Sequence, residues 1–192
     1  MANYCNDEFY TDIQKEDLFL LKMFSTQLSG LIKRIQDQNE FAFEDGARLI
    51  AQAAIGDGTI YLFGEKEMEA VISEALYSEE PFEKVKHWNG QSTDLSEADR
   101  VIVFSRYSHD QAAVNAGKWL LERNIPFVAV STHLSSDEDN LVHLADVHID
   151  LQLKKPLLPD DEGNRYGYPA STAALFVYYG LKFTLQEILE DF

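Results

Sequence analysis

Short apolar, β-branched runs alternate along this chain with stretches in which apolar residues recur at helical spacing. Strands are predicted by the runs at 59–63, 82–88, 100–104, 127–130 and 147–151, of which 82–88 is the weakest. Helices are predicted at 11–38, 41–54, 65–76, 109–122 and 169–190. This alternation predicts a three-layer α/β/α sandwich built on a parallel sheet, with two leading N-terminal helices.

Three pairs of residues have the spacing of a capping box, which predicts helix starts beside them: Thr11 with Gln14, Ser108 with Gln111, and Ser135 with Glu138. Pro169 suits the first position of the closing helix. Ahead of it, residues 154–168 are rich in Pro, Gly and Asp and predict an irregular loop. Arg165 is a candidate ligand contact if this loop closes over a ligand, and the alternative is an ordinary polar loop.

Length and composition fit one domain over residues 1–192. We divide it into N-terminal helices at 11–54, a sheet core at 58–151 and the closing helix at 169–190. Hydrophobic residues make up 45% of the chain, which is enough to exclude disorder as the default.

The charge balance limits the class of partner. The chain has 33 acidic and 16 basic residues, a formal net charge of −17. This disfavours nucleic acid and anionic membranes, because both bind to a clustered positive face. A small phosphorylated ligand is compatible with it, since a helix N-terminus and two or three cations are enough to hold one phosphate.

Several signals indicate a cytoplasmic protein without a cofactor. The one cysteine, Cys5, cannot form an internal disulfide or a cysteine-based zinc site. The N-terminus lacks the basic start and apolar run of a signal peptide, and the longest apolar stretch, 173–181, is too short to span a bilayer. No two histidines have the spacing of a helical zinc site, so we predict no metal, with a metal shared between subunits as the alternative. Isomerisation by proton transfer needs no organic cofactor, and we predict none.

The candidate chemistry lies in two strand–loop–helix units. The first two strongly apolar strands end at Phe63 and Phe104, and each is followed by small or polar residues and then a helical pattern. Open α/β sheets build anion sites in this way when the two strands are adjacent and parallel. Lys66 and Arg106 follow these strands and are candidates to neutralise a phosphate. The alternative is two solvated surface cations.

Further hydroxyl and acid–base groups stand near predicted strand ends. Ser105, Ser131 and Thr132 have hydroxyls suited to phosphate or sugar oxygens, or to capping loops. An aldose–ketose isomerase needs a base that moves a proton and an acid that assists the carbonyl oxygen. Glu74 and His109 are the candidates for these roles, with a solvated glutamate as the alternative for Glu74.

Four segments of the chain resemble the sugar isomerase, or SIS, family of phosphosugar-binding domains: 60–64, 98–105, 124–131 and 144–150. The two leading helices and the long closing helix look most like the phosphoheptose isomerase branch. The resemblance implies a flavodoxin-like parallel sheet and a sugar phosphate bound at the carboxyl ends of the strands. It also implies a homo-oligomer, a dimer or tetramer, in which the leading helices pair between subunits.

The resemblance also marks ligand-binding positions. Gly64 matches the first glycine of the family's first loop, and Ser105 matches the first serine of a second loop of the form Ser-x-Ser-Gly-x-Thr. Three positions of the second loop depart from that form: Tyr107, Ser108 and Asp110 stand where serine, glycine and threonine belong. An aspartate at a helix N-terminus suits the helix dipole but repels a phosphate placed there.

Two hypotheses of function follow. The first is a phosphosugar-binding protein that interconverts an aldose and a ketose phosphate, as a phosphoheptose-type isomerase does. The second, which the altered second loop favours, is a non-catalytic sugar-phosphate sensor or assembly module. Isomerisation assays combined with binding measurements on a panel of sugar phosphates separate the two.

Overall fold

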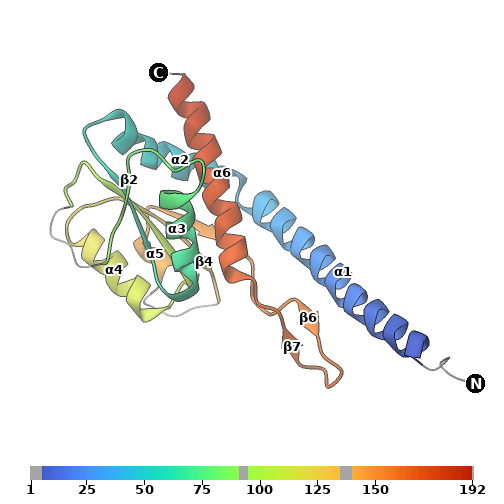
Figure 1. Ribbon diagram of the computed structural model, residues 1–192. Coiled ribbons are helices and arrows are strands. Elements are labelled where there is room, and N and C mark those ends of the chain that lie inside the picture. Colours follow the sequence, from blue (N-terminus) through green and yellow to red (C-terminus); the bar gives the residue numbers. More distant parts are fainter. Residues whose placement is uncertain (1–5, 91–94, 135–139, 192) are drawn as a thin grey trace, which may run out of the picture.

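The computed structural model describes residues 6–90, 95–134 and 140–191, with side chains from residue 19 onward. Within these residues, a five-stranded parallel sheet has the order β2-β1-β3-β4-β5 (Figure 1). Its strands are β1 (Ile60–Gly64), β2 (Val85–His87), β3 (Arg100–Tyr107), β4 (Phe127–Thr132) and β5 (Val147–Asp150). The predicted parallel sheet is therefore confirmed, including its weakest strand.

Helices cover both faces of the sheet. They are α1 (Asn6–Gln38), α2 (Glu40–Ile55), α3 (Glu69–Tyr77), α4 (Gln111–Leu121), α5 (Leu141–Leu144) and α6 (Ala170–Glu190), with a 3₁₀ turn, η1 (Lys66–Met68), ahead of α3. One hydrophobic core joins α1, α2, α3 and α6 to one face, and a second joins α4 and α5 to the other. The three-layer α/β/α sandwich is therefore confirmed.

The continuous apolar strands follow from this double covering. Every residue of β4 is buried, because one set of its side chains faces each core. In β3, Ile102 and Phe104 pack toward α2 and α6, whereas Val101 and Val103 pack toward α4. A polar substitution on either face of these strands would therefore be buried without a hydrogen-bond partner.

The sheet changes direction between β1 and β3. β1 leads through η1 and α3 to β2 on one side, and β3 leads through α4 to β4 on the other. The two strands are adjacent and in register, with Phe63 opposite Val103 and Gly64 opposite Phe104. Because the connections after them leave toward opposite faces, a crevice opens at their carboxyl ends.

Two predicted capping boxes do not cap a helix. Because α1 begins at Asn6, Thr11 lies inside it. Because α4 begins at Gln111 with Asp110 as its N-cap, Ser108 stands outside the helix. The Gln111 side chain donates instead through Nε2 to Asn115 Oδ1 at 2.8 Å.

Three other predictions, on the start of α6, the third capping box and the loop 154–168, also differ from the structure or lie outside the described residues. Pro169 is the N-cap of α6 and not its first residue. The pair Ser135 and Glu138 lies outside the described residues, and α5 has Asn140 as its N-cap, whose side chain accepts from the Val142 amide at 2.9 Å. The predicted loop 154–168 contains a short antiparallel hairpin of β6 (Leu158–Pro159) and β7 (Arg165–Tyr166).

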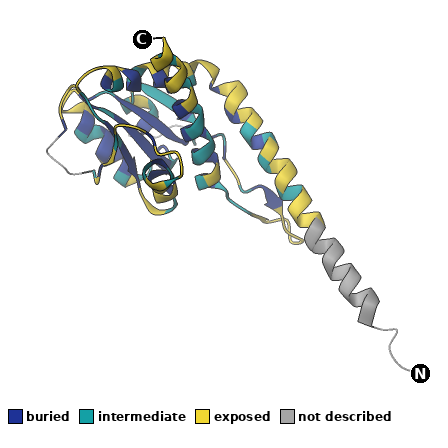
Figure 2. Ribbon diagram, turned by 45° about the horizontal axis from the view of Figure 1, so that its top comes forward, coloured by how far each residue is buried: buried dark blue, intermediate teal, exposed yellow. Residues whose placement is uncertain are grey.

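Helix α1 projects beyond the sheet, as Figures 1 and 2 show. Leu31 and Ile35 near its C-terminal end are fully buried in the core. Toward its other end, Phe19 and Leu21 are 61% and 59% exposed. The segment that projects therefore carries apolar side chains that the rest of this chain does not cover. In the described ranges, no helix combines the length and the apolar character needed to cross a membrane.

Asn39 ties the junction of α1 and α2 to the end of β5. Its side-chain amide donates to the Ile35 carbonyl at 2.7 Å and to the Asp150 carbonyl at 3.0 Å, and its Oδ1 accepts from the Asp150 amide at 2.9 Å. Asn39 is buried and makes no capping bond to α2. These bonds thus join segments that are far apart in the sequence.

We expect Asn39→Ala to lower the free energy of unfolding by about 2–3 kcal/mol, because it leaves buried partners of the Asn39 amide without hydrogen bonds. Urea denaturation followed by circular dichroism measures this loss, with the exposed Gln38→Ala as the matched control. A loss no larger than that of the control would show that the junction does not depend on these bonds.

Candidate functional site

A cleft of about 270 Å³ opens where β1 and β3 end. It is lined by residues of the two strand ends, the turn after β1 and the start of α4: Phe63, Glu65, Lys66, Glu67, Phe104, Ser105, Arg106, Asp110, Gln111, Ala112 and Ala113. The structure thus brings together Lys66, Ser105 and Arg106, three of the residues predicted to bind a ligand. The volume of the cleft lies just below the usual range for ligand pockets, roughly 300–1,000 Å³.

A tight turn after β1 brings Lys66 to the cleft. Gly64 permits this turn, since a Cβ there would lie 3.0 Å from the Met68 Cβ and 3.1 Å from the Met68 carbonyl oxygen. Lys66 itself has a positive φ of 56°, a conformation that glycine adopts more readily. The backbone therefore keeps a glycine-like turn while the side chain supplies a cation.

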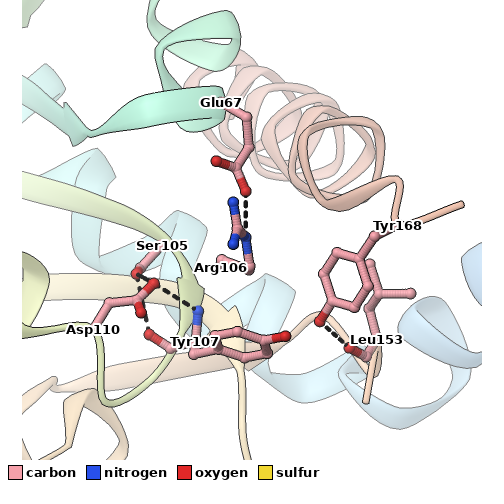
Figure 3. Close-up of polar contacts among 7 residues, drawn as sticks. All are labelled: Glu67, Ser105, Arg106, Tyr107, Asp110, Leu153 and Tyr168. Carbon is pink, nitrogen blue, oxygen red and sulfur yellow. Dashed lines mark hydrogen bonds and ion pairs between the residues drawn. The ribbon is translucent and has the colours of Figure 1, made fainter. Parts of the chain in front are cut away.

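Arg106 and Glu67 form an ion pair across the cleft (Figure 3). Arg106 Nε lies 2.5 Å from Glu67 Oε1, and the two side chains are 41% and 30% exposed. This hydrogen bond is the largest cause of a lowered pKa for Glu67 and of a raised pKa for Arg106. Arg106, one of the two candidate phosphate-binding cations, is thus paired with a carboxylate of the chain itself.

A loop that begins within the last residues of β3, at Ser105, folds around the Asp110 carboxylate (Figure 3). Asp110 Oδ2 accepts from the Tyr107 amide at 3.1 Å and lies 2.9 Å from the Ser105 hydroxyl. Although Asp110 is the N-cap of α4, its side chain makes no capping bond to that helix. The carboxylate therefore binds donors of the preceding loop and not those of its own helix.

Three aromatic rings, those of Tyr107, His109 and Tyr168, lie together beside the same loop. The Tyr107 ring stacks on the ring of the exposed His109, with centroids 5.4 Å apart, and lies 6.0 Å from the Tyr168 ring. The Tyr168 hydroxyl donates to the Leu153 carbonyl at 2.5 Å (Figure 3), and burial raises the pKa of this phenol. Neither Tyr107 nor His109 is among the cleft-lining residues.

Three of the predicted hydroxyl groups are buried. Ser108 and Thr132 have no exposed surface, and the Ser108 amide donates to the Thr132 carbonyl at 3.0 Å. Ser131 is also fully buried, and its Oγ lies 2.9 Å from His148 Nε2. Among the described residues the Ser108 and Thr132 hydroxyls have no hydrogen-bond partner, and none of the three residues lines the cleft.

Glu74 and Arg165 do not line the cleft and have partners elsewhere. Glu74 lies on α3 and accepts from the Tyr179 hydroxyl of α6 at 2.5 Å. Arg165 donates to the carbonyls of Pro156 and Leu157, at 2.8 Å each, and so holds the hairpin together.

A second hollow of about 280 Å³ adjoins the cleft and shares Phe63, Glu65 and Ala112 with it. Asn89, Asn115 and Trp119 also line this hollow, and sequence reasoning did not select them. Gln111, Asn115 and Trp119 follow one another at intervals of four, so they share one face of α4. This spacing in the sequence could have indicated that Asn115 and Trp119 lie on the same side of the helix as Gln111.

Within the described ranges, no three His, Cys, Asp or Glu side chains are grouped so as to hold a metal ion.

Solved structures share this fold at low sequence identity. A candidate phosphosugar isomerase involved in capsule formation, from Bacteroides fragilis, is 14% identical with a TM-score of 0.66, over 93% of this chain and 92% of that one. The Vibrio vulnificus NanR protein in complex with ManNAc-6P is 14% identical with a TM-score of 0.62, over 90% of this chain and 64% of that one. The chain thus has the α/β/α fold of phosphosugar isomerase domains.

Sequence comparison gives the particular family. The chain belongs to the family described as a domain of unknown function, DUF2529, whose model matches residues 20–189. The uncharacterized protein YwjG of Bacillus subtilis strain 168 is 43% identical over 173 residues, which cover 90% of this chain and 99% of YwjG.

The half-buried His148 predicts a pH dependence of stability. Burial is the largest cause that lowers its pKa to about 4, from 6.5 for a free side chain. As the pH falls below 6.5, His148 therefore becomes protonated in the unfolded chain, whereas in the folded chain it stays neutral until about pH 4. This contribution to stability is fully present above pH 6.5 and is lost as the pH falls between these two values.

We expect the wild type to lose up to about 3 kcal/mol relative to His148→Gln between pH 7 and pH 4, because glutamine has no charge to gain. Denaturant unfolding at a series of pH values measures the difference. Parallel curves for the two proteins would contradict a neutral His148 in the folded protein.

Proposed function

We propose that this protein binds a sugar phosphate in the cleft between the ends of β1 and β3, and that it acts as a sensor and not as an isomerase. The observation that carries the proposal is the convergence of Lys66, Arg106 and the first turn of α4 on one cleft at the switch point of the sheet. Two cations and a helix N-terminus are the groups that bind phosphate.

The fold neighbours support a ligand of this class. Phosphosugar isomerase domains share the architecture, and the neighbour NanR was solved with ManNAc-6P bound. In our proposal, the phosphate lies beside Arg106, and the sugar extends into the adjoining hollow. Asn115 and Trp119 at that hollow offer an amide and an aromatic face, which are groups that sugars contact.

The position of Glu74 favours binding without turnover. A general base must come within hydrogen-bond reach of the proton that it removes. Glu74 is held by Tyr179 on α6 and does not line the cleft. Three carboxylates do line it, those of Glu65, Glu67 and Asp110. Two of them are engaged, Glu67 by Arg106 and Asp110 by the Ser105 hydroxyl and the Tyr107 amide.

The second candidate is aldose–ketose isomerisation of the phosphoheptose type. His109 favours it, because this side chain is exposed in the loop directly ahead of α4 and is available as an acid or base. In this case the reaction moves a proton through an enediol and involves no redox change.

We expect Arg106→Ala to weaken binding of a sugar phosphate by about tenfold to a hundredfold, the effect of losing a charge-assisted hydrogen bond. Calorimetric titration with a panel of aldose and ketose phosphates measures this change. The matched control is Arg48→Ala, since Arg48 forms an exposed ion pair of the same 2.5 Å length with Glu44 on α2. Equal losses in the two variants would contradict the cleft as the binding site.

Incubating the wild type with the same panel, followed by chromatography of the sugars, separates the two candidates. The sensor predicts binding with no conversion of aldose to ketose. Conversion that is abolished by Glu74→Gln would instead support the isomerase, and this variant should leave binding unchanged if Glu74 only supports α3 against α6.

We further propose a cytoplasmic homo-oligomer in which α1 pairs with a second copy of the chain. The exposed Phe19, Leu20 and Leu21 on the projecting part of α1 support this. Clustered apolar side chains on one exposed segment are typical of an interaction surface. We place this protein in the cytoplasm because sugar phosphates are charged, and the membrane therefore retains them there.

We expect Leu21→Asp to weaken self-association by at least about tenfold, because it places a charge in an apolar contact. Size-exclusion chromatography with light scattering measures the mass over a dilution series. Tyr77→Asp is the control, since Tyr77 is 81% exposed on α3. A wild type that is monomeric at all concentrations would contradict the pairing.

A further inference from the structure

Two donors at the end of β3 already hold an anion that belongs to the chain. The Tyr107 amide donates to Asp110 Oδ2 at 3.1 Å, and the Ser105 hydroxyl lies 2.9 Å from the same oxygen. A hydroxyl and a backbone amide at the end of a buried strand are groups that commonly bind a phosphate oxygen. Asp110 therefore occupies with its carboxylate a position suited to an external anion.

The carboxylate cannot be explained as an ordinary helix cap. A capping aspartate accepts from the amides of the first helical turn, and Asp110 makes no such bond to α4. The amides of Gln111, Ala112 and Ala113 have no carbonyl partner within the helix, and these three residues line the cleft. The start of α4 thus keeps its positive end toward the cleft, with Asp110 beside it.

The principal cation of the cleft is engaged in the same way. Arg106 forms its ion pair with Glu67 from the turn after β1. Both sets of groups that would hold a phosphate, the arginine and the loop donors, are therefore matched by carboxylates of the chain (Figure 3). Glu65 adds a third carboxylate to the lining, against the cations Lys66 and Arg106.

We propose that Asp110 is an internal competitor for the ligand's phosphate and thereby sets which ligands the cleft accepts. This inference rests on the proposed function. An external phosphate has to displace the Asp110 carboxylate or bind next to its negative charge. This competition lowers the affinity for free inorganic phosphate most, because inorganic phosphate makes no further contacts outside the phosphate position. A sugar phosphate offsets this competition through its sugar, which reaches the adjoining hollow at Asn115 and Trp119. Asp110 thus makes the cleft select esters over free phosphate.

The test measures binding of inorganic phosphate to the full chain by calorimetry at constant ionic strength. We expect Asp110→Asn to bind phosphate at least about tenfold more tightly than the wild type, because asparagine keeps the shape and removes the competing charge. Asp45→Asn is the matched control, since it makes the same change in net charge on an exposed residue of α2, on the other face of the sheet. It should bind phosphate as the wild type does.

A second variant guards against misfolding. Asp110→Thr removes the carboxylate and keeps a residue that is favourable at a helix N-cap. It should also gain affinity for phosphate, and circular dichroism establishes that each variant is folded. Unchanged or weaker phosphate binding in both folded variants would overturn the role of Asp110.

Sugar phosphates tested on the same proteins keep the two proposals apart. If the wild type binds a sugar phosphate while the Asp110 variants gain nothing for inorganic phosphate, the proposed function stands and Asp110 is not a competitor. If the variants gain affinity for inorganic phosphate but no protein binds a sugar phosphate, the role of Asp110 stands and the sugar-phosphate function fails.

Discussion

The parallel pairing of β1 with β3 is the constraint on which the site depends. These strands are neighbours in the sheet, yet the connections that leave them pass to opposite faces, through α3 and through α4. Backbone amides and side chains at their carboxyl ends are consequently left facing a crevice, because no connection crosses it. Without this pairing, Lys66 and Arg106 would be unrelated surface cations.

The groups at this crevice are largely satisfied within the chain. Glu67 pairs with Arg106, and Asp110 accepts from the loop that Ser105 begins. In this arrangement the Arg106 guanidinium, the Ser105 hydroxyl and the Tyr107 amide each have an acceptor within the chain, without a ligand. It also means that ligand binding here is an exchange of internal partners for external ones, so that affinity depends on the difference between the two sets.

Much of the fold could be predicted from the sequence, because fully buried parallel strands are continuous apolar runs and their covering helices have a 3.6-residue period. The site could be predicted only in part. Lys66 and Arg106 follow strand ends, which the sequence displays directly. By contrast, the orientation of Glu74 depends on where α6 lies, and the partners of Arg165 depend on a hairpin within a loop rich in Pro and Gly. The Asp110 carboxylate has acceptable partners both in its helix and in the loop before it, and only the backbone geometry decides between them.

Mapping of backbone amide chemical shifts during titration of the labelled protein with a pool of aldose and ketose phosphates tests the central claim most directly. Our account predicts that saturable shifts concentrate in residues 63–67 and 105–113, the two strand ends and the start of α4. Saturable shifts confined to another region, such as the groove that Phe43 and Phe176 line between α2 and α6, would contradict it.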